Sequence, residues 1–325
     1  MTNREACIQW IKDYYKDNPD GKAVIGISGG KDSTVAAALC VEALGADRVI
    51  GVRMPNGEQN DINDSRKVCE YLGIYAFELN IGSTVNTLCR EIDEAYDYDH
   101  CCINNPMIKT NLPARIRMTT LYAVAALYPN SRVVNTCNRS EDYVGYSTKY
   151  GDAAGDFSPL GNLTVREVLE IGDELGLPEH LVHKTPSDGM CGKSDEDNLG
   201  FTYEQLDDHI LGTQKINPEI EEKIERLHKA TRHKYKPMPM FDPTAPCVDS
   251  NQLTIDDYAD GGLVTPDFNA AAVSGNAIMT GLGIVEPVAT NNVSINTDYK
   301  LEDAIKSIEN SIWKSIVCNE IRGIK

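Results

Sequence analysis

The sequence has 325 residues, of which 41% are hydrophobic, and its 31 basic and 49 acidic side chains give a formal net charge of −18. This length allows one large domain or two smaller ones. So acidic a chain is a poor candidate for binding a nucleic-acid backbone or an anionic membrane, because both carry negative charge.

The ten cysteines show no regular spacing and no pair separated by two residues. They favour reduced thiols over a disulfide framework or a zinc site. The N-terminal segment lacks the cationic start and apolar run of a signal peptide, and no apolar stretch has the length and purity of a membrane span. We therefore expect a cytoplasmic protein with neither a membrane nor a nucleic acid as partner.

Short apolar runs alternate with helical patterns along the first 136 residues. The apolar runs predict strands at 22–28, 48–54, 74–81 and 132–136. The stretches between them predict helices at 34–44, 61–72, 83–96 and 112–128. This alternation predicts an α/β fold with a doubly wound parallel sheet and helices on both faces. Ligands are then expected beyond the carboxyl ends of the strands.

The second half of the chain divides at a cluster of prolines from Pro237 to Pro246. Before it, residues 143–163 have a loop-like, glycine-rich pattern, and helices are predicted at 164–176, 203–211 and 217–233. The prolines mark a boundary, so we expect a domain at 1–239 and a C-terminal extension at 240–325. A helical stripe at 299–318 predicts that the extension packs on the domain or on a second subunit.

The strongest motif is SGGKDST at 28–34, between a predicted strand and a predicted helix. Glycines let backbone amides approach an oxyanion, and the helix N-terminus adds partial positive charge. Ser28, Ser33 and Thr34 supply hydroxyls, and Lys31 supplies a cation. A carboxylate beside a phosphate is repulsive unless a divalent cation lies between them, so we interpret Asp32 as a magnesium ligand. The alternative is a glycine turn that only opens a helix.

This motif is not a Walker A loop, because Ile25 holds the first glycine position and Asp32 follows the lysine. It resembles the pyrophosphate loop of the N-type ATP pyrophosphatases, which form acyl-adenylates, and it implies their adenine nucleotide alpha hydrolase-like fold. The nucleotide would then contact the loop and the residues before it, namely Gly26, Ile27, Ser28, Gly29, Gly30, Lys31 and Ser33.

Further segments are similar to one branch of that superfamily, the ammonia-dependent NAD synthetases. These are RMPNGEQNDINDS at 53–65, NLPARIRM at 111–118, NTCNRSEDYVGYSTKYGDAAGDFSPLGNLTVREV at 135–168, KTPSDGMCGKSDEDNLGFTYEQLDDHILG at 184–212 and HKYKP at 233–237. The resemblance covers about residues 1–239 and does not extend into 240–325.

The resemblance implies a role for each matching position. Further ATP contacts would come from Arg53, Gln59, Thr136 and Ser187. Magnesium would be held by Asp32 and Glu141. The deamidated dinucleotide would be bound by Arg115, Lys149, Asp156, Glu196, His233 and Lys234. Asp32, Lys149 and Ser187 would act most directly in the reaction.

Two positions depart from the family pattern. Val165 stands where the family usually has a lysine that contacts ATP phosphate. The neighbouring Arg166 would point elsewhere on a helix. Asp188 stands where the family has a small residue. Both departures bear on how efficiently the chain uses ATP.

The implied reaction joins nicotinic acid adenine dinucleotide, ATP and ammonia, with Mg²⁺ as cofactor, to give NAD, AMP and pyrophosphate. The loop begins at Ser28, so we expect no glutamine-hydrolysing domain before it, and free ammonia or ammonia from a partner is implied. A homodimer is implied only by the family. Two alternatives remain: a pyrophosphate-loop enzyme that amidates another carboxylate, and a non-catalytic nucleotide-binding homologue.

Overall fold

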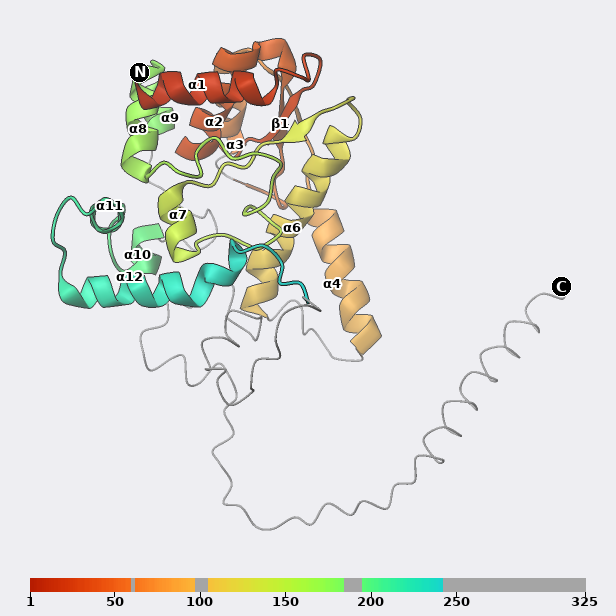
Figure 1. Cartoon of the computed structure of the whole chain (residues 1–325). Coiled ribbons are helices and arrows are strands. Elements are labelled where there is room, and N and C mark those ends of the chain that lie inside the picture. Colours follow the sequence, from red (N-terminus) through yellow and green to blue (C-terminus); the bar gives the residue numbers. More distant parts are fainter. Residues whose placement is uncertain (60–61, 97–104, 184–194, 242–325) are drawn as a thin grey trace, which may run out of the picture. The chain divides into compact units, whose positions relative to one another are not determined.

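The computed structural model describes residues 1–59, 62–96, 105–183 and 195–241 (Figure 1). Four strands form one sheet, β1 (Ala23–Gly26), β2 (Val49–Arg53), β3 (Tyr75–Glu78) and β4 (Arg132–Val133). Their order is β3-β2-β1-β4 and every neighbouring pair is parallel. The predicted parallel sheet is therefore confirmed, with β1 at its centre.

Helices surround this sheet. They are α1 (Asn3–Tyr14), α2 (Lys31–Leu44), α3 (Ile62–Leu72), α4 (Gly82–Tyr96), α6 (Pro106–Ala125), α7 (Arg139–Val144), α8 (Val165–Glu174), α9 (Glu179–Val182), α10 (Asp195–Leu199), α11 (Tyr203–Leu211) and α12 (Pro218–Thr231), with short 3-10 turns η1 (Ala46–Arg48) and η2 (Arg232–Lys234). In the part of the chain that the structure describes, no helix is both long and apolar enough to cross a membrane.

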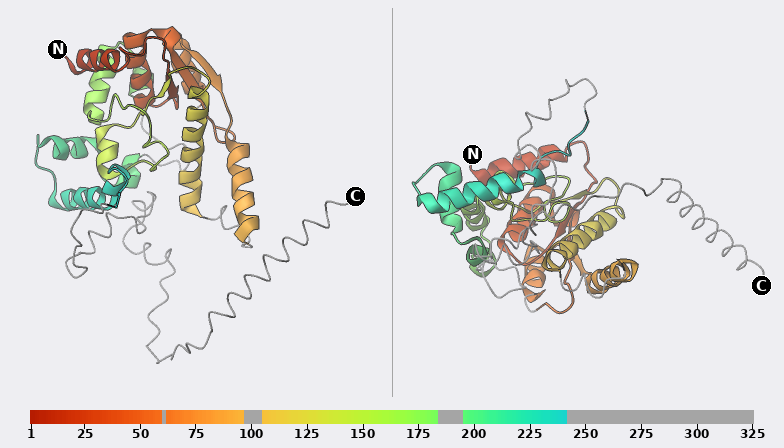
Figure 2. Two further views of the ribbon diagram at one scale, coloured as in Figure 1. Left: turned by 45° about the vertical axis from the view of Figure 1, so that its right-hand side comes forward. Right: turned by 90° about the horizontal axis from the view of Figure 1, so that it is seen from below.

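Alternate residues of the strands serve two separate cores. Ala23 and Ile25 of β1 pack with α1, α2, α8 and α9 in one hydrophobic cluster, whereas Val24 packs with α4 and α6 in another. This period of two is expected of a strand covered on both faces. The two helical layers are visible on either side of the sheet in Figures 1 and 2.

A third cluster lies under α11 and α12, beyond the carboxyl ends of the strands. It contains Val144, Val165, Leu199, Phe201, Tyr203, Leu206, Ile224 and Leu227. This cluster joins α7, α8, α10, α11 and α12, so it fixes the helices that face the SGGKDST loop.

The observed elements differ from the predicted ones at several ends. Helix α6 begins at Pro106, because Asn105 caps it by accepting from the amides of Met107 and Ile108. It continues through Pro113, which lies inside the helix. The helices α1, α7, α9 and α10 were not predicted.

Of the predicted strand at 132–136, only Arg132 and Val133 form the observed strand β4. After Val133 one hydrogen bond to β1 remains, from Val134 N to Val24 O at 2.9 Å. The chain also pairs with residues 156–157: Asp156 N donates to Val133 O at 2.8 Å, and Asn135 N donates to Phe157 O at 2.9 Å. The predicted helix at 299–318, like the rest of 242–325, lies outside the described residues.

Candidate active site

The SGGKDST loop joins the end of β1 to the start of α2, as its sequence predicts. Gly30 is the N-cap residue of α2, and Ser28 Oγ accepts from Gly30 N at 3.2 Å. Gly29 has φ +84°, and a Cβ atom there would lie 2.8 Å from Ser65 N. Only glycine suits this position, because both the left-handed backbone and the close approach exclude a side chain. The loop therefore presents the first turn of α2 toward the carboxyl edge of the sheet.

Asp32 is met by the residue that begins α7. Asn138 Nδ2 donates to Asp32 Oδ1 at 2.9 Å. Asn138 also begins α7 with a capping box: its side chain accepts from Glu141 N at 3.0 Å, while the Glu141 carboxylate accepts from Asn138 N at 3.3 Å. Local helix capping thus carries Glu141 to the carboxylate of Asp32.

The proximity of these two carboxylates is reflected in the pKa of Glu141. Burial raises that pKa well above its ordinary value, and the negative charge of Asp32 raises it further, while Lys31 opposes the shift. A cation between the two carboxylates would relieve this repulsion. The structure thus brings together the two predicted metal ligands.

Lys31 is a buried cation, with 6% of its surface exposed. Its Nζ lies 2.8 Å from Asp32 Oδ2 and 5.4 Å from the centre of the Tyr203 ring. Burial alone would lower the pKa of Lys31, but the negative charges of Asp32 and Glu141 outweigh it and raise that pKa. Lys31 therefore keeps its positive charge within the loop.

The other predicted ATP contacts follow neighbouring strands. Arg53 is the last residue of β2, and its Nε lies 3.5 Å from a carboxylate oxygen of Glu78 at the end of β3. Gln59 lies in the turn after β2, and Thr136 follows β4. The carboxyl ends of parallel strands share one edge, so these residues and the loop are on the same edge. Ser187 lies outside the described residues.

Four of the predicted dinucleotide contacts form a second group. Arg115 Nε on α6 donates to Lys149 O at 3.2 Å, and Lys149 Nζ donates to His233 O at 2.9 Å. Lys234 Nζ donates to Gly145 O and Ser147 O at 3.0 and 2.8 Å. The ammonium of Lys234 is thus bound by two backbone carbonyls and holds the 145–149 loop to η2.

The remaining two predicted contacts lie elsewhere. Glu196 Oε1 accepts from Tyr203 N at 2.9 Å, at the start of α11. Asp156 Oδ2 accepts from Val133 N at 2.7 Å, and Asp156 Oδ1 accepts from Tyr122 at 3.3 Å. Since Val133 pairs with Val24 before the end of β1, Asp156 is placed away from the SGGKDST loop.

The two departures from the family pattern have different outcomes. Val165 is 6% exposed and packs in the third hydrophobic cluster, next to residues of α7 and α11. The Arg166 guanidinium turns away and donates to Asp208 Oδ1 at 3.0 Å. Arg166 therefore does not replace a cation at position 165. Asp188 lies outside the described residues.

Several residues near the loop were not identified from the sequence. Asn138 is one, although the spacing Asn-x-x-Glu at 138–141 is a capping-box signal. Asp195 and Tyr203 are two more: both are buried, and their charges or dipoles act on Lys31. Asp195 also accepts from the Tyr146 hydroxyl at 3.2 Å. No sequence signal marks these last contacts, because they join residues far apart in the sequence.

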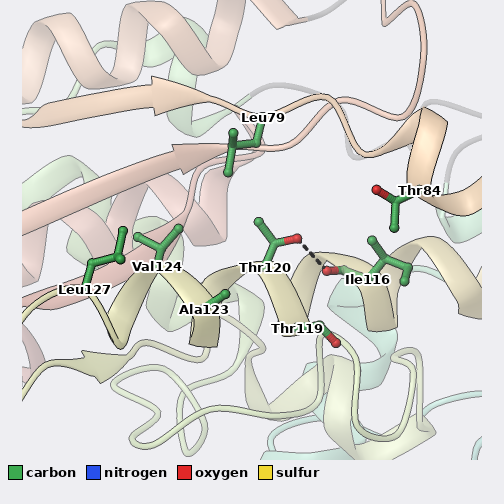
Figure 3. Close-up of a pocket in the computed structure, with 8 residues that line it drawn as sticks. All are labelled: Leu79, Thr84, Ile116, Thr119, Thr120, Ala123, Val124 and Leu127. Carbon is green, nitrogen blue, oxygen red and sulfur yellow. Dashed lines mark hydrogen bonds between the residues drawn. The ribbon is translucent and has the colours of Figure 1, made fainter.

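A separate apolar groove of about 390 Å³ lies between α6 and the segment that runs from the end of β3 into α4 (Figure 3). Figure 3 shows its lining, which is Leu79, Thr84, Ile116, Thr119, Thr120, Ala123, Val124 and Leu127. Leu127 is 73% exposed. The groove contains none of the predicted site residues.

Comparison with known proteins identifies the family of this chain. The NAD synthase family model matches residues 4–238. An NH(3)-dependent NAD(+) synthetase of Pyrococcus furiosus is 37% identical over 249 residues, which cover 71% of this chain and 92% of that protein. A second such enzyme, from Alkaliphilus metalliredigens, is also 37% identical and is covered over 94% of its length.

Solved structures give the same result. An NMN synthetase from Francisella tularensis superposes with a TM-score of 0.66 at 33% identity, covering 75% of this chain and 98% of that one. An NH3-dependent NAD synthetase from Campylobacter jejuni gives a TM-score of 0.61 at 27% identity, with 74% and 98% covered. The predicted family and fold are therefore confirmed, and this chain belongs to the NAD synthase family.

Proposed function

We propose that this chain is an ammonia-dependent NAD synthetase that uses ATP to activate the carboxylate of nicotinic acid adenine dinucleotide. The observation that carries the proposal is the meeting of Asp32 and Glu141, through Asn138, at the SGGKDST loop. The match of residues 4–238 to the NAD synthase family supports it.

The reaction first converts the carboxylate oxygen into a good leaving group. A carboxylate is a poor electrophile, so its oxygen attacks the α-phosphorus of ATP and expels pyrophosphate. Ammonia then attacks the carbonyl carbon of the acyl-adenylate, and AMP leaves. No side chain need form a covalent bond. The work of the protein is to bind the phosphates with backbone amides at the start of α2, with the hydroxyls of Ser28 and Ser33, and with Lys31.

The donor set at Asp32 and Glu141 fits Mg²⁺. Magnesium prefers oxygen ligands and is usually bound by one or two carboxylates together with substrate phosphates. Burial raises the pKa of Glu141 and the negative charge of Asp32 raises it further, and a divalent cation would oppose both effects. When bound, magnesium would neutralise negative charge on the departing pyrophosphate. Asn138 would orient the Asp32 carboxylate for this purpose.

The acid substrate would lie toward Arg115 and Lys149. These two side chains come from α6 and from the loop before α8, and η2 braces the same loop through Lys149 and Lys234. Contacts of the dinucleotide with His233, Glu196 and Asp156 remain part of the proposal. Nicotinic acid mononucleotide is a second candidate acceptor, because one similar structure is an NMN synthetase.

We also propose that the protein works as a cytoplasmic homodimer. The five cysteines among the described residues are all free and buried, which suits a reducing compartment. The apolar groove beside α6, whose lining includes the exposed Leu79 and Leu127, supports pairing with a second copy, because exposed apolar patches mark interfaces. Light scattering of the full chain would measure the mass directly.

The test is product formation by the purified full chain. With ATP, Mg²⁺, ammonium and the deamidated dinucleotide, we expect NAD, AMP and pyrophosphate in equal amounts. Glutamine in place of ammonium should give no NAD. The mononucleotide acid is run in parallel, and a higher kcat/KM with it would reassign the acceptor. If pyrophosphate release from ATP does not depend on an acceptor, or does not occur, the ligase activity is refuted.

A further inference from the structure

Tyr203 is a buried side chain at the start of α11, and only 5% of its surface is exposed. Thr202 caps this helix through a box with Gln205, and Tyr203 N donates to the Glu196 carboxylate. The ring packs in the third hydrophobic cluster beside Val165. Backbone and ring are therefore held from both sides, so the direction of the hydroxyl is fixed.

The hydroxyl at the end of this ring has no hydrogen-bond partner among the described residues. Two other described tyrosines that are not exposed have hydrogen-bonded hydroxyls. The Tyr15 hydroxyl donates to Lys22 O at 3.2 Å, and the Tyr146 hydroxyl donates to Asp195 at 3.2 Å. A buried polar group without a partner destabilises the fold, so such groups in folded proteins call for an explanation.

The surroundings of the hydroxyl are those of the nucleotide site. The Lys31 ammonium lies over the Tyr203 ring at 5.4 Å from its centre. Burial, followed by the negative charges of Glu141, Asp195 and Asp32, raises the pKa of Tyr203 well above its ordinary value. The hydroxyl therefore stays protonated and can donate. It lies close enough to these carboxylates to feel their charge, but it is bonded to none of them.

We propose that Tyr203 is a nucleotide-binding residue: its buried hydroxyl donates a hydrogen bond to a phosphate oxygen of ATP, and its ring holds Lys31 against the same phosphates. This inference rests on the proposed function, because it assumes that the SGGKDST loop binds ATP. A phosphate oxygen suits the hydroxyl because it is an anionic acceptor that arrives with the ligand. The cost of the unpartnered hydroxyl is then removed when the nucleotide binds.

The experiment uses Tyr203→Phe, which deletes one oxygen and keeps the ring, its packing and its contact with Lys31. Tyr15→Phe is the matched control, because Tyr15 is also buried but its hydroxyl is bonded to Lys22 O, just before β1, whereas Tyr203 lies near the loop that follows β1. Two quantities are measured on the full chain without acceptor substrate: the melting temperature in the absence of nucleotide, and the Kd for ATP with Mg²⁺ by calorimetry.

We expect opposite results for the two variants. Tyr203→Phe should keep or raise the melting temperature and should weaken ATP binding about tenfold or more, as expected for loss of a hydrogen bond to a charged group. Tyr15→Phe should lower the melting temperature and leave the Kd unchanged. In turnover, Tyr203→Phe should raise the KM for ATP more than it lowers kcat.

Three outcomes would overturn the inference. One is a Kd for Tyr203→Phe within twofold of the wild-type value. The second is a melting temperature of Tyr203→Phe that falls as far as that of Tyr15→Phe. The third is a failure of Tyr203→Phe to fold. The second and third outcomes would show that the hydroxyl is structural. Failure of the wild-type protein to bind ATP with Mg²⁺ is a different result, because it would refute the proposed function itself.

Discussion

Replacing Lys234 with methionine tests whether this residue acts first as a structural brace. Lys234 is 6% exposed, and its ammonium donates to Gly145 O and Ser147 O. The family resemblance assigns it to the dinucleotide. In the structure its ammonium instead stabilises the loop that carries Lys149, because Gly145 O and Ser147 O belong to that loop. Methionine keeps the length and the apolar stem but removes the charge and both hydrogen bonds.

The expected loss can be estimated from these contacts. Each buried carbonyl left without its partner costs about 1–3 kcal/mol, and part of this is offset because methionine is easier to bury than an ammonium. Burial raises the pKa of the Asp152 carboxyl, and the charge of Lys234 is one of the effects that oppose this rise, so its stabilisation of the carboxylate would be lost too. We expect the free energy of unfolding to fall by about 2–4 kcal/mol. For a domain of this size the melting temperature would fall by about 5–15 °C.

The assay is thermal unfolding without substrates, followed by circular dichroism. Lys236→Met is the control, because Lys236 is two residues away and exposed. A residue that served only to contact the dinucleotide would raise the KM for that substrate and leave the melting temperature unchanged. A melting temperature of Lys234→Met within about 1 °C of the control would therefore refute the brace.

Four further results are expected. Asp32→Asn should keep the fold and lower NAD formation at least about 100-fold at saturating Mg²⁺; near wild-type rates would contradict its assignment. Gly145→Ala should lower the urea midpoint, since Gly145 has φ +68° and a Cβ there would lie 2.2 Å from Thr231; an unchanged midpoint would show that α7 and α12 can move apart. Hydrogen bonds from Thr213, and to a smaller extent from Arg166, lower the pKa of Asp208. Asp208→Asn should therefore lower the melting temperature at pH 7, and its difference from the wild type should shrink as the pH falls below about 4. A difference that does not depend on pH would exclude this charge effect. Truncation after Met240 should lower the melting temperature or change the mass in solution while activity remains, whereas no change in either would mean that residues 240–325 are a loose appendage.

The sequence determined the order along the chain of the four strands and of the helices between them, and the position of the loop. Alternating apolar and amphipathic segments are local patterns, and they predicted the parallel sheet and the SGGKDST turn between β1 and α2. The family resemblance then supplied Asp32 and Glu141 as a pair. Short-range signals were also available for α7, whose capping box at Asn138 was overlooked.

Only the tertiary structure decided how distant side chains meet. Asn138 reaches Asp32 across 106 positions of sequence, and Lys31 lies over the ring of Tyr203. The same packing places Val165 in a hydrophobic cluster and commits Lys234 to two backbone carbonyls. Capping and periodicity act within a few residues and can be read along the chain. The partners of a buried charge or hydroxyl are instead set by which helices pack together, because burial removes water and leaves each polar group dependent on whatever the fold brings beside it.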